Sequence, residues 1–209
     1  MAEVLFEWVV EHLNYFWITV LMAIESSFIP FPSEIVVPPA AYLAATKGTM
    51  DITLVIVFAT LGALIGAFIN YGLAIWIGRP LVYKFANSRF GHMCLIDEAK
   101  VVKAEAYFDR HGAISTFIGR LIPAVRQLIS IPAGLARMNL GKFSIYTSLG
   151  AGIWNAVLAA LGYWLSTFVP FDELEKQVEH YNSYLTYAGL GIGVIVVIFI
   201  LYHALKKKK

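Results

Sequence analysis

Residues 119–134 read GRLIPAVRQLISIPAG, a stretch that is apolar enough for a lipid bilayer yet carries two arginines and two prolines. A straight transmembrane helix tolerates such a sequence poorly. Proline removes a backbone donor and clashes with the preceding turn, and a charged side chain at bilayer depth costs about 2.5–3.5 kcal/mol on insertion scales. The stretch therefore predicts a broken or re-entrant hairpin that lies against protein and water rather than lipid.

Composition places the whole chain in a membrane. Of its 209 residues, 59% are hydrophobic and only 14% are charged, and the mean hydropathy is +0.69. Soluble proteins carry about 25% charged residues, so we expect neither a soluble domain nor a nucleic-acid partner. The single cysteine, Cys94, excludes an intramolecular disulfide, and it lies near His92 without a metal-ligand pattern. We therefore expect no metal and no cofactor.

An earlier stretch, residues 25–41, has the same construction with acidic side chains. When Pro30 is laid over Pro123, Pro39 also meets Pro132. Prolines are few in this chain, so two matches with the same spacing indicate an internal repeat. The charged side chains of the two copies are Glu25, Glu34, Arg120 and Arg126.

The pattern as a whole predicts an all-α, polytopic membrane protein in which two inverted re-entrant hairpins pack among transmembrane helices. Residues 1–209 form a single membrane domain in this prediction. Its segments are an amphipathic helix with the first hairpin (1–51), a transmembrane helix (52–78), a cytoplasmic amphipathic segment (79–112), the second hairpin (113–142), a transmembrane helix (143–169), an outer loop (170–183), a transmembrane helix (184–205) and a basic tail (206–209).

Small and aromatic residues predict how the helices pack. Gly62 and Gly66 form a small-xxx-small face on which another helix can approach closely. Asn70 is the main polar group of the same helix, and we expect its amide to bond to a neighbouring helix rather than to substrate. The tryptophans fall mostly near predicted helix ends and are interpreted as interface anchors; they are Trp8, Trp17, Trp76, Trp154 and Trp164.

The distribution of charge gives the orientation. The lysines at 206–209 and the basic residues at 79–110 mark the cytoplasmic face by the positive-inside rule, whereas residues 170–182 are acidic and lie outside. The C-terminus is therefore cytoplasmic, and the two hairpins enter from opposite sides. Residues 1–13 predict an interfacial amphipathic helix with its glutamates on one side. Whether this helix crosses the membrane is left open.

Four ionisable side chains at membrane depth would together cost about 10–14 kcal/mol if unpaired. We therefore expect Glu25 and Glu34 to approach Arg120 and Arg126. Two arginines at a helix break, with free backbone N–H groups, can also bind a phosphate. Phosphate and carboxylate would compete for the arginines, so release of a lipid phosphate would be coupled to protonation of Glu25 or Glu34. The alternative is that the four charges are ion pairs that only hold the hairpins together.

These motifs resemble those of the DedA family of bacterial membrane proteins, the SNARE-associated Golgi protein group. The matching residues are ESSFIPFPSE at 25–34, FDRHG at 108–112, FIGRLIPAVR at 117–126, PAG at 132–134, Met138 and Trp154. The resemblance covers about residues 15–168. It implies inward-facing re-entrant hairpins, with Glu25 and Glu34 at the two acidic positions of the family and Arg120 and Arg126 as its two essential arginines.

The resemblance also implies a function. It points to a flippase of the bacterial cytoplasmic membrane that moves a polyprenyl phosphate carrier lipid, foremost undecaprenyl phosphate. Its partners would be an anionic lipid phosphate, membrane lipids and protons, or sodium in their place. A phosphatidylethanolamine or general phospholipid translocase or scramblase stays open, as does a structural membrane protein. The lipid, the direction of transport and the oligomeric state, including a homo-oligomer, are not determined by the sequence.

An enzyme is the reading that the sequence disfavours. A lipid phosphatase would need a nucleophilic histidine beside the arginines. None of the five histidines lies within the hairpins; they are His12, His92, His111, His180 and His203. We therefore expect a protein that is not an enzyme.

Overall fold

The computed structural model describes residues 2–27, 33–88 and 98–174, and beyond these residues 176–178, 180–181, 184, 187 and 191. This part of the chain is helical and contains no strand, so the all-α prediction is confirmed for it. Its elements are α1 (Ala2–His12), α2 (Tyr15–Glu25), η1 (Ser33–Ile35), α3 (Val37–Lys47), α4 (Ile52–Leu73), η2 (Ala74–Gly78), α5 (Arg79–Ala86), α7 (Glu98–Leu121), α8 (Pro123–Arg126), α9 (Ser130–Leu135), α10 (Leu140–Leu165) and η3 (Phe171–Glu173). The predicted tip of the first hairpin, with Pro30, and most of the helix predicted at 184–205 lie outside the described residues, as does the tail at 206–209.

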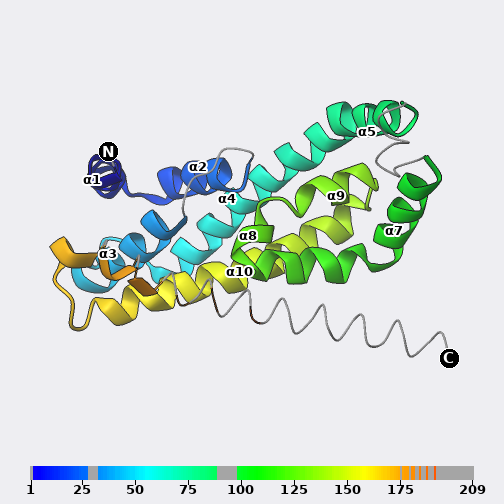
Figure 1. Ribbon diagram of the computed structural model, residues 1–209. Coiled ribbons are helices and arrows are strands. Elements are labelled where there is room, and N and C mark those ends of the chain that lie inside the picture. Colours follow the sequence, from blue (N-terminus) through cyan, green and yellow to red (C-terminus); the bar gives the residue numbers. More distant parts are fainter. Residues whose placement is uncertain are drawn as a thin grey trace.

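Two long helices extend through most of the molecule (Figure 1). The helix Ile52–Lys84 comprises α4, the π-helical turn η2 and most of α5; it has 33 residues, and an 18-residue window of it has a mean hydropathy of 2.6. Helix α10 has 26 residues, and its corresponding 18-residue window has a mean hydropathy of 1.3. Both are long and apolar enough to cross a membrane. At 1.5 Å per residue the first is about 50 Å long, so the helix that we expected to end at residue 78 continues into α5.

Each long helix keeps an apolar face exposed. On α4 this face consists of Leu54, Val57, Leu61, Ile65, Phe68, Ile69 and Leu73, and on α10 it includes Ile145, Leu149, Ile153 and Val157. Monomeric soluble proteins rarely expose contiguous apolar surface of this extent. These faces are therefore suited to contact with lipid, and the other faces of the two helices carry the rest of the protein.

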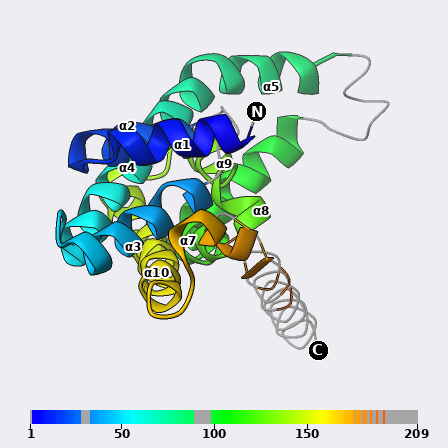
Figure 2. The same cartoon turned by 90° about the vertical axis from the view of Figure 1, so that its left-hand side faces the viewer.

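Two sets of shorter helices pack on this pair. We call α2, η1 and α3 the first arm, and α7, α8 and α9 the second arm. Figure 1 shows the first arm over one half of the long helices and the second arm over the other half. In the first arm α2 packs on α4 and α3 packs on α10 (Figure 2), whereas in the second arm α7 packs on α10 and α9 packs on α4. This reciprocal packing agrees with the predicted internal repeat; re-entry of the arms into a membrane stays a prediction.

Glycines allow the arms to approach the long helices. A Cβ atom added to Gly62 or Gly66 would overlap a backbone carbonyl oxygen of α2, so the prediction of a close helix contact at these two residues is confirmed. On α10, Gly162 meets the backbone of Pro38 in α3 in the same way. The largest apolar core lies where the first arm meets the long helices; it includes Ile18, Met22, Val37, Ala40, Val55, Ala59 and Leu158.

The second arm is broken where its proline requires it. Ile122 adopts an extended backbone (φ −101°, ψ 115°), because a residue before proline avoids the α region. Helix α7 therefore ends at Leu121, and Pro123 begins α8 at the position where its missing N–H has no helical partner to lose. The break places Arg120 in the last turn of α7 and Arg126 at the end of α8.

The N-terminal segment is an amphipathic helix, as predicted. Phe6 and Val9 of α1 are buried, whereas Glu7 and Glu11 are exposed. The helix has 11 residues, about half of the number needed to span a bilayer.

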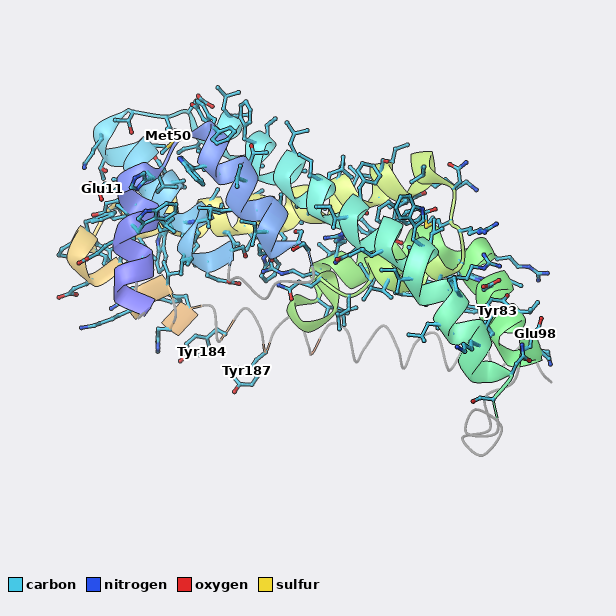
Figure 3. The ribbon with its side chains drawn as sticks, turned by 90° about the horizontal axis from the view of Figure 1, so that it is seen from above. Glu11, Met50, Tyr83, Glu98, Tyr184 and Tyr187 are labelled. Atoms are coloured by element: carbon cyan, nitrogen blue, oxygen red, sulfur yellow. The ribbon has the colours of Figure 1, made fainter. Side chains whose placement is uncertain are left out.

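The two ends of the molecule are formed by different segments of the chain. Figure 3 shows Glu11 and Met50 at one end and Tyr83 and Glu98 at the opposite end. The α3–α4 connection therefore shares an end with α1, while α5 and the start of α7 form the other. Helix α7 then runs without interruption from Glu98 to Leu121, so the boundary that we expected at residue 112 lies inside it.

Candidate functional site

The two arms meet at the side chain of Arg126. Its Nη2 atom lies 2.7 Å from Glu25 Oε1 and 3.6 Å from Glu34 Oε1, and it donates a 2.7 Å hydrogen bond to Ser33 Oγ. Arg126 is 9% exposed and Glu25 only 2% exposed. All three partners belong to the first arm, so the second arm inserts a buried cation into it.

The position of this contact agrees with the internal repeat. Ser33 and Arg126 are 93 residues apart, which is the offset that aligns Pro30 with Pro123. They therefore occupy equivalent positions in the two copies. Equivalent residues of an inverted repeat can touch only near the axis that relates the copies, so the contact marks the centre of the repeat.

Arg120 is buried as deeply but has fewer partners. It is 2% exposed, and its Nη2 donates a 2.8 Å hydrogen bond to Ser130 Oγ in its own arm. Its stem lies against Gly150 of α10, where an added Cβ would come within 2.5 Å of the Arg120 Cβ. The structure thus brings both predicted carboxylates to Arg126, whereas Arg120 bonds to a neutral hydroxyl and shares only a small cavity with Glu25.

Trp154 also belongs to this cluster, which corrects the prediction that it is an interface anchor. It is only 7% exposed, and its ring lies 5.2 Å from the Arg126 Cζ atom in a cation–π contact. The prediction was wrong because Trp154 lies in the middle of α10, on the side that faces the arms. Trp76 and Trp164, by contrast, are 83% and 48% exposed.

Two amides join the arms around the charges. The Asn70 Nδ2 donates to the carbonyl oxygens of Ser26 and Gln127, both at 3.2 Å, and the Gln127 Nε2 donates to the carbonyl oxygen of Glu25 at 3.1 Å. The prediction that Asn70 bonds to neighbouring elements is confirmed. Since Ser26 and Gln127 come from different arms, this single amide holds both arms against α4.

Sequence reasoning missed three polar residues of the site: Ser33, Ser130 and Gln127. They carry no charge, so an argument from the cost of burying charge does not select them. A usable signal was their position inside apolar, proline-containing stretches. A polar side chain there needs a hydrogen-bond partner. Ser33 and Ser130 each accept a hydrogen bond from an arginine, and Gln127 donates one to the carbonyl oxygen of Glu25.

A small cavity lies within the cluster. It has a volume of about 10 Å³ and is lined by Met22, Glu25, Ser26, Ala63, Arg120, Arg126, Ala151, Trp154 and Asn155. This volume is at the lower limit for a single water molecule. A phosphate group therefore enters only if a side chain moves, and the carboxylate of Glu25 already occupies the place of an anion beside Arg126. Its other oxygen, Oε2, accepts a 2.6 Å hydrogen bond from Ser26 Oγ.

A larger cavity of about 380 Å³ lies between α5, α7 and α9, and its wall is almost entirely apolar. Its lining includes Val82, Val101, Phe108, Pro132, Leu135 and Ala136. At its rim, Arg79 Nη2 lies 3.0 Å from Glu105 Oε2, which also accepts a 3.1 Å hydrogen bond from the Tyr83 hydroxyl. Helix α9 thus carries Ser130 at one end, beside the buried arginine, and an apolar cavity at the other.

The histidines that the structure describes bond to or pack against residues other than Arg120 and Arg126. The Nδ1 atoms of His12 and His111 donate to carbonyl oxygens one turn earlier in their own helices, and His180 packs against two tyrosine rings. His92 and His203 lie outside the described residues. Within the part of the chain that the structure describes, no three His, Cys, Asp or Glu side chains form a group that could hold a metal ion.

Comparison with known proteins gives consistent matches along the chain. The VTT domain matches residues 31–164. The chain is 33% identical over 207 residues to the alkaline phosphatase-like protein of Lactococcus lactis subsp. lactis (strain IL1403), covering 99% of this chain and 94% of that protein. It is 30% identical over 206 residues to undecaprenyl phosphate transporter A of Staphylococcus aureus (strain NCTC 8325 / PS 47), covering 99% and 96% of the two chains. No solved structure matches.

A further relative extends the agreement. Undecaprenyl phosphate transporter A of Bacillus subtilis (strain 168) is 32% identical over 177 residues, which covers 85% of this chain and 82% of that protein. The VTT match includes Glu34 and both arginines of the cluster, and the relatives also span the N-terminal part that carries Glu25. The chain therefore belongs to the VTT-domain, or DedA, family of membrane proteins.

Proposed function

We propose that this protein is a transporter that moves a polyprenyl phosphate carrier lipid, foremost undecaprenyl phosphate, across the bacterial cytoplasmic membrane, with protons taken up by Glu25 and Glu34. The observation that carries the proposal is the contact of one buried guanidinium, Arg126, with both carboxylates at the meeting point of the arms. A cation held by exchangeable anions can accept a phosphate in their place. The names of the Staphylococcus and Bacillus relatives support the choice of lipid.

The charge balance of the cluster favours a phosphate that arrives together with protons. Two carboxylates and two guanidinium groups make the cluster neutral when all four are ionised. A phosphate monoester carries about −1.5 to −2 charges at pH 7, and such a charge is costly to bury without compensation. Protonation of Glu25 and Glu34 restores neutrality and releases Arg126 at the same time. Binding of the lipid phosphate and uptake of protons are then two halves of one exchange.

The apolar cavity suits the hydrocarbon chain of such a lipid. Ser130 holds Arg120 at one end of α9, and Leu135 lines the cavity at the other end. At 1.5 Å per residue, the two positions are about 8 Å apart along the helix axis. The arginine site and the apolar cavity thus lie at the two ends of one short helix, an arrangement that suits a phosphate with an attached hydrocarbon chain.

Transport in liposomes tests the proposal. Undecaprenyl phosphate or phosphatidylethanolamine is incorporated with the purified protein, and the fraction of lipid exposed on the outer leaflet is followed with and without a pH gradient. The variants are Arg126→Ala and, as control, Lys103→Ala, which removes an exposed positive charge of α7. We expect gradient-dependent movement of undecaprenyl phosphate that Arg126→Ala abolishes and Lys103→Ala preserves.

The other outcomes assign the alternatives. The phosphate of phosphatidylethanolamine is balanced by its own ammonium group, so movement of this lipid without a gradient would indicate a phospholipid translocase. Movement of both lipids without a gradient would indicate a scramblase. Transport driven by a sodium gradient in place of a pH gradient would identify sodium as the coupling ion. Release of inorganic phosphate would indicate an enzyme. If no lipid moves, the charged cluster has a structural role.

A further inference from the structure

Three polar atoms of the charged cluster make no hydrogen bond to any residue that the structure describes: Glu25 Oε1, Arg120 Nε and Trp154 Nε1. Glu25 Oε1 lies 2.7 Å from Arg126 Nη2, but no N–H of Arg126 points at it, so this contact is an ion pair without a hydrogen bond. Buried polar atoms almost always have a hydrogen-bond partner. Three such atoms in one cluster therefore suit a small polar occupant, either a water molecule or an atom of a ligand.

The three atoms match the chemistry of a single oxygen atom. Arg120 Nε and Trp154 Nε1 are N–H donors, and Glu25 Oε1 is an acceptor when its carboxyl group is ionised. The same three residues line the small cavity of about 10 Å³. That volume holds about one water-sized group. An oxygen atom has the two lone pairs that accepting both N–H bonds requires.

Packing alone does not explain why this position holds tryptophan. Trp154 contacts Arg126 through the face of its ring, and a phenylalanine could supply an aromatic face as well. The indole adds an N–H group at the ring edge, and a buried N–H without a partner destabilises the protein. The donor therefore needs a function that offsets this destabilisation, and binding an oxygen atom supplies one.

We propose that Arg120, Trp154 and Glu25 form a subsite for one oxygen atom of the lipid phosphate, in which the indole N–H of Trp154 is a substrate-binding group. The inference rests on the proposed function. An unprotonated phosphate oxygen accepts from Arg120 Nε and Trp154 Nε1 but cannot donate, so Glu25 faces it only after taking a proton from water. A water molecule, which accepts two hydrogen bonds and donates one, fits the same three atoms when Glu25 is ionised. The subsite thus links its occupant to the protonation of Glu25.

The test compares Trp154→Phe with Trp164→Phe. Trp164 lies on the same helix, is 48% exposed and contacts Phe168 and Tyr181 outside the cluster. Binding of dodecyl phosphate to the purified full-length protein in detergent micelles is measured by isothermal titration calorimetry, and the melting temperature of each variant reports on its folding. We expect roughly tenfold weaker binding for Trp154→Phe, the effect of losing one hydrogen bond to a charged group. Trp164→Phe should bind like the wild type.

Each outcome supports or overturns the proposed subsite. Wild-type affinity of Trp154→Phe, with or without a lower melting temperature, would give Trp154 a packing role and overturn the subsite while the proposed function stands. If Trp154→Phe does not fold, Arg120→Lys replaces it, because lysine keeps the positive charge and lacks the Nε donor; wild-type affinity of that variant would also overturn the subsite. If the wild type does not bind dodecyl phosphate, the proposed function and the subsite fall together.

Discussion

The two arms pack on the same pair of long helices in a reciprocal way, yet they hold their charges differently. The first arm presents two carboxylates and a serine hydroxyl, and all three converge on Arg126 of the second arm. Arg120, six residues earlier, remains bonded to Ser130 within its own arm. A nearly symmetric backbone therefore carries one cation that is shared between the arms and one that is not.

This difference indicates which arginine loses its partners when the carboxylates take up protons. The partners of Arg126 are carboxylates, whose attraction disappears when they are protonated. The hydrogen-bond partner of Arg120 is a neutral hydroxyl, so that bond does not depend on protonation. We infer that Arg120 keeps its hydrogen bond to Ser130 when the carboxylates are protonated, whereas Arg126 is released from its partners. The four predictions below test this division, beginning with the largest expected effect.

Removal of the deepest charge should have the largest effect. In Glu25→Gln the buried guanidinium of Arg126 loses its nearest anion, and breaking one partner of a buried pair costs about 3–5 kcal/mol. We expect a loss of this size in the free energy of unfolding in detergent, together with loss of transport. The double variant Glu25→Gln/Arg126→Gln removes both charges and should regain most of the stability without transport. Glu11→Gln, on the exposed side of α1, is the control. A double variant as unstable as Glu25→Gln would show that the pair is not the cause.

The two serines should differ in importance. Ser130 accepts the hydrogen bond of Arg120, and a buried hydrogen bond to a charged group contributes about 1.5–3 kcal/mol. Ser130→Ala should lower the unfolding free energy by this amount, whereas Ser33→Ala should cost less because Arg126 keeps its two carboxylates. Ser144→Ala, which removes an exposed hydroxyl bonded within its own helix, controls for loss of a serine. Equal effects at Ser33 and Ser130 would contradict the division between the two arginines.

The helices of the fold could be predicted where the sequence carries a strong local signal. Pro123 breaks the second arm because of its own backbone chemistry, and the apolar runs in α4 and α10 are long enough to be recognised as spans. The continuation of α4 into α5 was not predicted, because the basic residues from Arg79 onward indicate a separate cytoplasmic segment. The π-helical turn at Ala74–Gly78 ends two residues before Pro80. Such a turn changes the backbone hydrogen bonding where proline cannot donate.

The site could be predicted only as a set of charges. The cost of burying them implies that Glu25 and Glu34 pair with arginines, but it does not decide which one. That choice depends on α8, which turns Arg126 toward the first arm. The place of Trp154 likewise depends on tertiary packing, because a tryptophan in a glycine-rich helix looks the same in sequence whether it faces lipid or a guanidinium.

Two glycines of α10 should separate stability from transport. In Gly162→Ala the new Cβ meets the backbone of α3, which cannot easily move, and overpacking of this kind costs roughly 1–3 kcal/mol. In Gly150→Ala the new Cβ meets the Arg120 Cβ and the backbone carbonyl oxygen of Phe117, so we expect a similar loss of stability and, in addition, a clear loss of transport as the guanidinium is displaced. Gly72→Ala, with open space at its Cβ, should raise stability by up to about 1 kcal/mol. If Gly150→Ala transports like the wild type, the position of Arg120 does not matter.

The smallest effect is expected at Glu34. Its Oε1 lies 3.6 Å from Arg126, beyond hydrogen-bond distance, and its side chain is 12% exposed, so water shares the stabilisation of its charge. Glu34→Gln should lower the unfolding free energy by at most about 1 kcal/mol, the upper end for partly solvated ion pairs. Transport should persist with a weaker dependence on the pH gradient, because only Glu25 then takes up a proton as the phosphate binds. The rate in liposomes is measured over a series of gradients, with Glu173→Gln in the exposed η3 turn as control. A loss as large as that of Glu25→Gln would mean that the deep and the shallow carboxylate are equal partners of Arg126.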